Sequence, residues 1–205
     1  MRAIVFMLVF VATIGYSCNR ETNNMTEKET KLINSESADV PFYVLQTTDE
    51  ADSLFLRTKC VDLDIQNILK NKDLQLLIER MKATLMDEEG VGLAAPQVGI
   101  GRNLFLFMRI DKPDFPVQVA INPKIVNTPD EMICFEGDGC LSIPDVSGDT
   151  FRYPWIDVEY YDEKGELHKE RLSGYSRDDD FTGIIFQHEF DHLQGVLFID
   201  KICSE

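Results

Sequence analysis

The sequence predicts an α+β domain in which antiparallel or mixed β-sheets pack around a C-terminal helix. Extended stretches follow one another between residues 103 and 172, and they do not alternate with helices. Asp73–Asp87 has apolar residues at helical spacing and is expected to be a surface helix with one buried stripe. The last helical stretch contains Gln187-His188-Glu189-Phe190-Asp191-His192, in which two histidines four residues apart share one face.

Length and charge limit the function classes. The 205 residues, 44% hydrophobic and 27% charged, suffice for one domain with a sizeable core and short extensions. The formal net charge is −16. Nucleic-acid binding depends on lysine and arginine against phosphates, so this charge argues against a nucleic acid as partner.

Residues 1–17 are expected to be a signal peptide. Met1-Arg2 supplies one positive charge, and Ile4–Ile14 is almost wholly apolar but too short to span a bilayer. Small residues and Cys18 follow, which is typical of a bacterial lipoprotein signal. We therefore expect export to the cell envelope and a membrane anchor through a lipidated Cys18. A plain signal peptide or a short membrane anchor is the alternative, and the chain would be cytoplasmic if this segment is not a functional signal.

Residues 18–40 are polar and are predicted to be a flexible tether, so the catalytic domain is expected to span residues 41–205. Glu89-Gly90 is expected to end the helix over Asp73–Asp87, with the glycine as its stop. Asn103–Ile110 is predicted to be a buried strand, and Val117–Ile121 a second one that Asn122-Pro123 closes.

The remaining elements follow from local patterns. Further strands are predicted at Ile125-Val126, Met132–Phe135, Trp155–Tyr161 and Leu167–Leu172, the last two forming a hairpin. Glu136–Pro144 is rich in turn residues, and Ser173–Asp180 is a polar, acidic loop. Thr182 is expected to cap the last helix and Gly195 to stop it, before a short terminal strand at Val196–Ile199.

The two histidines and Glu189 form the HExxH pattern of zinc-type hydrolases. Catalytic sites of this type take a third protein ligand and leave one position for water. Cys140, His168 and several carboxylates are candidates. Cys140 is favoured because a tight turn can present its thiolate, whereas His168 lies among charged residues and is expected to be a plain surface residue.

Five cysteines have to be placed. If Cys18 carries lipid and Cys140 binds metal, three remain, and an odd number argues against a fully disulfide-bonded scaffold. In an oxidising compartment, one disulfide among Cys60, Cys134 and Cys203 is possible, and the sequence does not decide which pair forms it.

Three strings, in this order, resemble the motifs of the peptide deformylase family: Gly90-Val-Gly-Leu-Ala-Ala-Pro-Gln97, Gly139-Cys-Leu-Ser142 and Gln187-His-Glu-Phe-Asp-His192. The resemblance runs from about Val44 to Ile202 and implies hydrolysis of the formyl group from N-formyl-methionyl peptides. It implies that Cys140, His188 and His192 bind one divalent ion, Fe²⁺ or Zn²⁺ with Ni²⁺ as a further option. Glu189 would activate the bound water.

The resemblance also assigns residues to the substrate. The Gln97 side chain and the Leu141 backbone N–H would hold the oxyanion. Apart from the resemblance, the metal chemistry does not require Asp191, which is expected to orient the helix or a metal ligand. Gln97 tying down a loop, and Cys140 as a small buried hydrophobe, are the structural alternatives. The pocket for the methionine side chain would be lined by Val91, Phe181, Ile184 and Ile185, and the backbone of Gly92 would contact the peptide. The alternative for the four apolar residues is ordinary core packing, and for Gly92 it is a tight turn.

Departures from the family pattern leave the substrate open. Asp138 stands where the family usually has glutamate, so a looser turn is expected, and Ser147 stands where an arginine commonly contacts the peptide. The acidic run Asp178–Asp180 would repel acidic peptides if it borders the cleft. Export adds two further alternatives: an envelope metal-dependent amidase or peptidase with another substrate, and a non-catalytic binding lipoprotein.

Overall fold

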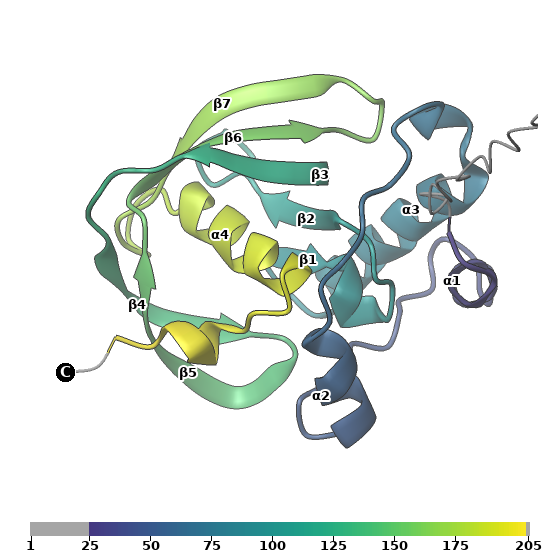
Figure 1. Cartoon of the computed structure of the whole chain (residues 1–205), viewed down its shortest axis with the longest axis horizontal. Coiled ribbons are helices and arrows are strands. Elements are labelled where there is room, and N and C mark those ends of the chain that lie inside the picture. The colour runs from purple at the N-terminus through teal and green to yellow at the C-terminus, as the bar shows by residue number, and fades with distance from the viewer. Residues whose placement is uncertain (1–24, 204–205) are drawn as a thin grey trace, which may run out of the picture.

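The computed structural model describes residues 25–203, in which two antiparallel sheets enclose one helix (Figure 1). The larger sheet has the strand order β1-β2-β3-β6-β7, and the smaller consists of β4 and β5. Helix α4 (Thr182–Leu193) lies between the two sheets, in yellow in Figure 1. The predicted α+β class is confirmed. The expected signal peptide, Cys18 and residues 18–24 of the expected tether lie outside the described residues.

Five strands form the larger sheet: β1 (Gly92–Ala94), β2 (Leu104–Met108), β3 (Val117–Asn127), β6 (Trp155–Tyr161) and β7 (Leu167–Ser173). The hairpin of β6 and β7 is confirmed. The prediction that Asn122-Pro123 closes a strand is wrong, because β3 continues to Asn127. The pairing of β3 with β6 shifts register between Ile121 and Lys124, so a bulge accommodates the missing proline N–H.

Strands β4 (Ile133–Cys140) and β5 (Ile143–Arg152) replace the turn predicted over Glu136–Pro144. The glycines of this stretch lie where the pairing of the two strands shifts register, and Gly137 takes a positive φ of 68°. Only the Leu141-Ser142 pair forms the turn, with Cys140 opposite Ile143. Cys140 is therefore held at the end of a strand.

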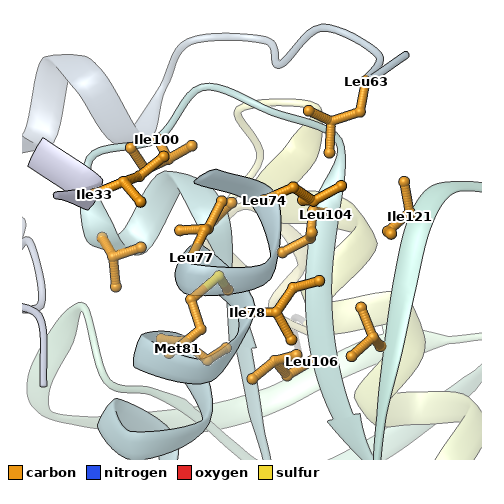
Figure 2. Close-up of a cluster of buried hydrophobic side chains, with 14 of the residues drawn as sticks. Ile33, Leu63, Leu74, Leu77, Ile78, Met81, Ile100, Leu104, Leu106 and Ile121 are labelled. Atoms are coloured by element: carbon orange, nitrogen blue, oxygen red, sulfur yellow. The ribbon is translucent and has the colours of Figure 1, made fainter. Parts of the chain in front are cut away.

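Helix α3 (Lys72–Asp87) carries one apolar stripe against the larger sheet (Figure 2). Leu77 and Ile78 are fully buried against Leu104 and Leu106 of β2. The helix begins after Asn71, whose side chain accepts from the Leu74 N–H. Its predicted glycine stop is wrong by one residue, because Glu89 takes the left-handed conformation, with φ 51°. Gly90 follows and donates its N–H to the Leu85 carbonyl.

Helix α4 is fixed by aromatic packing on the inner face of the sheet. The ring of Phe186 lies 4.8 Å from that of Phe105 and 5.3 Å from that of Phe107, both edge to face. Such pairs contribute about 0.5–1.5 kcal/mol each beyond the area they bury. The packing sets the rotation of the helix and directs His188 and His192 away from the aromatic core. Gly195, with φ 73°, follows the helix as predicted.

The prediction of a flexible tether is wrong for residues 25–40. Helix α1 (Glu27–Ile33) forms there, begins with a Thr26 capping box and buries Ile33 completely. The Glu29 carboxylate is buried against the Arg102 guanidinium at 2.7 Å. The buried Arg80 donates to backbone carbonyls of Leu32, Ile33 and Val40. Two distant arginines therefore fold a segment that has few apolar residues of its own.

Shorter elements complete the fold. Helix α2 (Glu50–Leu56) and the 3₁₀ turns η1 (Ile68–Lys70) and η2 (Ala95–Val98) precede β2. The terminal strand predicted at Val196–Ile199 is wrong: a 3₁₀ turn, η3 (Phe198–Lys201), forms because the Asp200 carboxylate accepts from the Leu197 N–H. Within residues 25–203, no helix is long and apolar enough to cross a membrane.

A disulfide joins Cys134 of β4 to Cys203, and Cys60 is a buried free thiol. Of the pairings that the sequence left open, the structure thus selects the one that ties the C-terminal segment to the smaller sheet. Burial raises the pKa of the Cys60 thiol to about 12, so this cysteine remains protonated and unreactive.

Candidate active site

Three predicted metal ligands converge between β4 and α4. The Sγ of Cys140 lies 3.2 Å from Nε2 of His192. One donor atom from each of Cys140, His188 and His192 lies within 4.8 Å of the others. The donors fit a divalent ion, because metal–sulfur and metal–nitrogen bonds of about 2.3 and 2.0–2.1 Å can meet within such a triangle. Three ligands leave a fourth position for water or substrate.

Asp138 fixes the orientation of His188. Its Oδ1 lies 2.9 Å from Nδ1 of that imidazole, which leaves Nε2 as the atom available to a metal. Its Oδ2 accepts from the Thr150 hydroxyl at 2.8 Å and from Nη2 of Arg152 at 2.7 Å. The expected looser turn at Asp138 is therefore wrong. The shorter side chain is buried and saturated by partners from β5 and α4.

Glu189 follows the first histidine and is 4% exposed. Its Oε2 has no hydrogen-bond partner among the described residues, and burial raises the pKa of its carboxyl group to about 7. The group can therefore exchange a proton near neutral pH. Gly92 makes room for it, because a Cβ at that position would lie 2.3 Å from Oε1 of Glu189.

The two imidazoles have opposite proton affinities in the metal-free protein. Burial disfavours the charged form of both. For His188, the hydrogen bond that its imidazole donates to the Asp138 carboxylate, together with the nearby Cys140, outweighs burial and holds its pKa well above the usual value. For His192, burial and the positive charge of His188 act together and hold its pKa well below it. A neutral His192 can ligate a metal without losing a proton.

Gln97 and Leu141 lie beside the cluster. The Gln97 Oε1 accepts from the Ala94 N–H at 2.8 Å, which aims its Nε2 at Ser142 Oγ (3.2 Å) and at the Cys140 sulfur (3.6 Å). The Leu141 N–H lies in the turn after β4 and has no hydrogen-bond partner among the described residues. Two hydrogen-bond donors thus flank the site, and one of them, the Leu141 N–H, has no partner among the described residues.

A cavity of about 370 Å³ opens beside these groups. Cys140, His188 and Glu189 form one end of its wall. The five residues predicted to contact substrate all line it: Val91, Gly92, Phe181, Ile184 and Ile185. The volume is that of a small-ligand site, and the aliphatic side chains suit an unbranched apolar group such as a methionine side chain.

Comparison with known proteins identifies the family. The model of the polypeptide deformylase family matches residues 44–205. The chain belongs to the peptide deformylase family.

Two curated deformylases show the extent of the similarity. Peptide deformylase 2 of Nostoc sp. is 42% identical over 147 residues, which cover 68% of this chain and 77% of that protein. The peptide deformylase of Synechocystis sp. is 38% identical over 150 residues, covering 72% and 76%.

Solved deformylase structures share the fold. The class I type b enzyme of Acinetobacter baumannii with Met-Ala-Ser bound has a TM-score of 0.68 and 30% identity, over 80% of this chain and 99% of that one. The Synechococcus elongatus enzyme in complex with actinonin has a TM-score of 0.66 and 33% identity, over 80% of each chain.

The sequence did not identify the arginine at the centre of this deformylase site. Arg152 has a fully buried side chain and bridges Asp138 to Asp191, whose Oδ2 accepts from Nη1 at 2.5 Å. Lys201 of η3 donates to the other oxygen of Asp191 at 2.7 Å. Asp191 thus acts through Arg152, in agreement with its expected orienting role. The alternation of Thr150 and Arg152 along β5 was the only available signal, and it does not name their partners.

Other deformylase positions differ from expectation. Thr182 is not the cap of α4; Phe181 holds that position, and the Thr182 hydroxyl accepts from the Asp111 N–H at 3.1 Å. His168 is not a plain surface residue, because it stacks on Tyr160 at 5.0 Å and bonds Asp162 at 3.0 Å. It lies outside the cluster of Cys140, His188 and His192.

The departures near the cleft can also be placed. Ser147 borders a second hollow, which shares Cys140 and Leu141 with the active site and has no lysine or arginine in its lining. The acidic run Asp178–Asp180 would repel acidic peptides only if it bordered the cleft. It is absent from the described lining of the active-site cavity, whereas the preceding Arg177 belongs to it.

Proposed function

We propose that this chain removes the formyl group from N-formyl-methionyl peptides, releasing formate and a methionyl peptide. The observation that carries the proposal is that Cys140, His188 and His192 converge at the end of an apolar cavity that also contains the Glu189 carboxylate. A related deformylase has been solved with Met-Ala-Ser bound, which is the product expected from formyl-Met-Ala-Ser.

The side chains have complementary tasks. A divalent ion held by Cys140, His188 and His192 would lower the pKa of a coordinated water and polarise the formyl group. With a pKa of about 7, Glu189 accepts the proton of the attacking water and passes it to the leaving amine. Gln97 Nε2 and the Leu141 N–H stabilise the negative charge that develops on the formyl oxygen.

Formate release from formyl-Met-Ala-Ser tests this function. The chain should be purified without oxygen from residue 19 onward, so that every described residue is kept. Glu189→Gln should lower kcat by about 100-fold or more with unchanged metal content, because a general base typically contributes about 10²–10⁴-fold. Cys140→Ser should lose metal affinity.

The alternatives give other results. Metal without formate release, together with cleavage of other amides, indicates an amidase or peptidase. Protein that binds neither metal nor peptide indicates a non-catalytic scaffold. Retention of full activity in Glu189→Gln would refute the assigned role of that residue.

We propose iron or zinc as the metal, because a thiolate with two imidazoles suits either ion, and nickel is the further option. Metal analysis of anaerobically purified protein, followed by reconstitution with each ion, distinguishes the three.

We further propose that the enzyme is exported and anchored through Cys18. The signal-like residues 1–17 support export, and so does the Cys134–Cys203 bridge, because disulfides persist in oxidising compartments. Lipid labelling and membrane fractionation should be compared between wild type and Cys18→Ala. Loss of label and of membrane association in the variant is expected, whereas an unlabelled wild type in the cytoplasmic fraction would refute the anchor.

A further inference from the structure

Arg177 contributes a positive charge to the active-site cavity. It lies in the loop between β7 and α4, and no other lysine or arginine of residues 25–203 lines the cavity. Its Nη2 donates to the Gly137 carbonyl at 2.5 Å. Its guanidinium carbon lies 5.7 Å from the ring centroid of Phe135 and 5.8 Å from that of Phe181, and both rings line the same cavity. The side chain is thus held at the rim by three neighbours.

The charge of Arg177 is not neutralised inside the loop. No carboxylate of the described residues forms an ion pair with it, although three aspartates follow it directly. Asp180 instead accepts from the Thr182 N–H at 2.9 Å, at the start of α4. The backbone N–H groups of Asp178 and Asp179 are tied to Ser176. The Arg177 guanidinium of this loop therefore lines the cavity, whereas Asp178–Asp180 do not.

The orientation of the substrate follows from the two ends of the cavity. The formyl group has to meet Cys140, His188 and Glu189, and the aliphatic wall takes the methionine side chain. The rest of the peptide then runs towards the rim. An arginine has five N–H donors in a planar fork that matches a carboxylate, and the structure uses only one of them on Gly137.

We propose that Arg177 binds the C-terminal carboxylate of short formyl-peptides, which gives the enzyme a preference for free di- and tripeptides with an unblocked C-terminus. This inference rests on the proposed function. The charge of Arg177 matters in a chain of net charge −16, because the acidic surface, which includes Glu89 of the cavity lining, repels such peptides.

The test compares the acid and C-terminal amide forms of formyl-Met-Ala and formyl-Met-Ala-Ser as substrates. For wild type, we expect kcat/KM about 3- to 10-fold higher for the acids, the size of a charge-assisted contact at a partly solvated site. The effect should lie mainly in KM and weaken at high salt. Arg177→Gln should reduce the acid-to-amide ratio to about 1, and Arg177→Lys should retain part of it.

Arg171→Gln is the matched control. Arg171 lies on β7, is half exposed and pairs with Asp157, so its loss changes the net charge equally but leaves the cavity intact. We expect the wild-type ratio in this variant. Equal ratios in wild type and Arg177→Gln would overturn the inference while leaving the deformylase function standing. Failure of wild type to release formate from all four peptides would instead refute the proposed function.

Discussion

The substitution Gly92→Ala tests how closely the backbone fits the catalytic carboxylate. Gly92 lies in β1, and a Cβ there would be 2.3 Å from Oε1, 2.7 Å from Cδ and 2.9 Å from Cγ of Glu189. Ordinary contact begins near 3.4 Å, so the carboxylate would have to move by roughly 1 Å. The two nearest atoms, Oε1 and Cδ, form the far end of a side chain, which can rotate without moving the strand.

This geometry separates the effect on catalysis from the effect on folding. A misplacement of about 1 Å at a catalytic group costs about 100-fold in rate, equivalent to about 2.7 kcal/mol of transition-state stabilisation. Gly92 does not have a positive φ, so alanine introduces no backbone strain there. We therefore expect kcat to fall about 100-fold while the free energy of unfolding changes by no more than about 1 kcal/mol.

The measurements are formate release, metal content and urea unfolding of Gly92→Ala. Gly101→Ala is the matched control, because its Cβ would find its nearest neighbours at 4.0 Å, far from the metal ligands. Full metal content and normal stability with lost activity would support the placement of Glu189. A kcat within about threefold of wild type, in protein that is folded and metal-loaded, would refute it.

Three further predictions concern stability. Cys203→Ala opens a bridge to Cys134 that spans 69 residues, and we expect urea unfolding to show a loss of about 2–4 kcal/mol that reductant reproduces in wild type. Arg109 lowers the pKa of Asp111 from its ordinary 3.8 to about 2, so about 1–2 kcal/mol of stability, complete above pH 4, should disappear as pH falls towards 2 in wild type but not in Asp111→Asn. Glu29→Ala removes the buried carboxylate that meets the Arg102 guanidinium at 2.7 Å, so α1 should lose protection in hydrogen exchange at a cost of about 3–5 kcal/mol; unchanged protection would restore the tether prediction.

The sequence predicted those features of the site that short-range spacing controls. His188 and His192 share a face because four residues separate them on a helix, and Glu189 follows from the same spacing. The hairpin of β6 and β7 likewise follows from alternation around a short turn. Each of these inferences needs only neighbouring residues and one regular geometry.

The missed arginine of the site and the missed helix α1 depend on partners that are distant in the sequence. The bond from Arg152 to Asp191 spans 39 residues, and the one from Arg102 to Glu29 spans 73. A buried arginine and an exposed one have the same local sequence pattern, and only the strand register decides which carboxylate the buried one meets. Helix α1 was missed for this reason, since its polar residues are stabilised by partners that its own composition does not reveal.

Asp138 stands where the family usually has glutamate, and the effect of this exchange could not be judged from the length of the side chain alone. It lies on β4 between Cys134, which holds the C-terminal segment by a disulfide, and the predicted metal ligand Cys140. Because β4 is held by this disulfide and by its pairing with β5, the Asp138 carboxylate lies close enough to reach His188 and Arg152 without an extra methylene. The disulfide and the short carboxylate therefore act on the same strand, and the position of β4 determines whether aspartate can replace glutamate at this site.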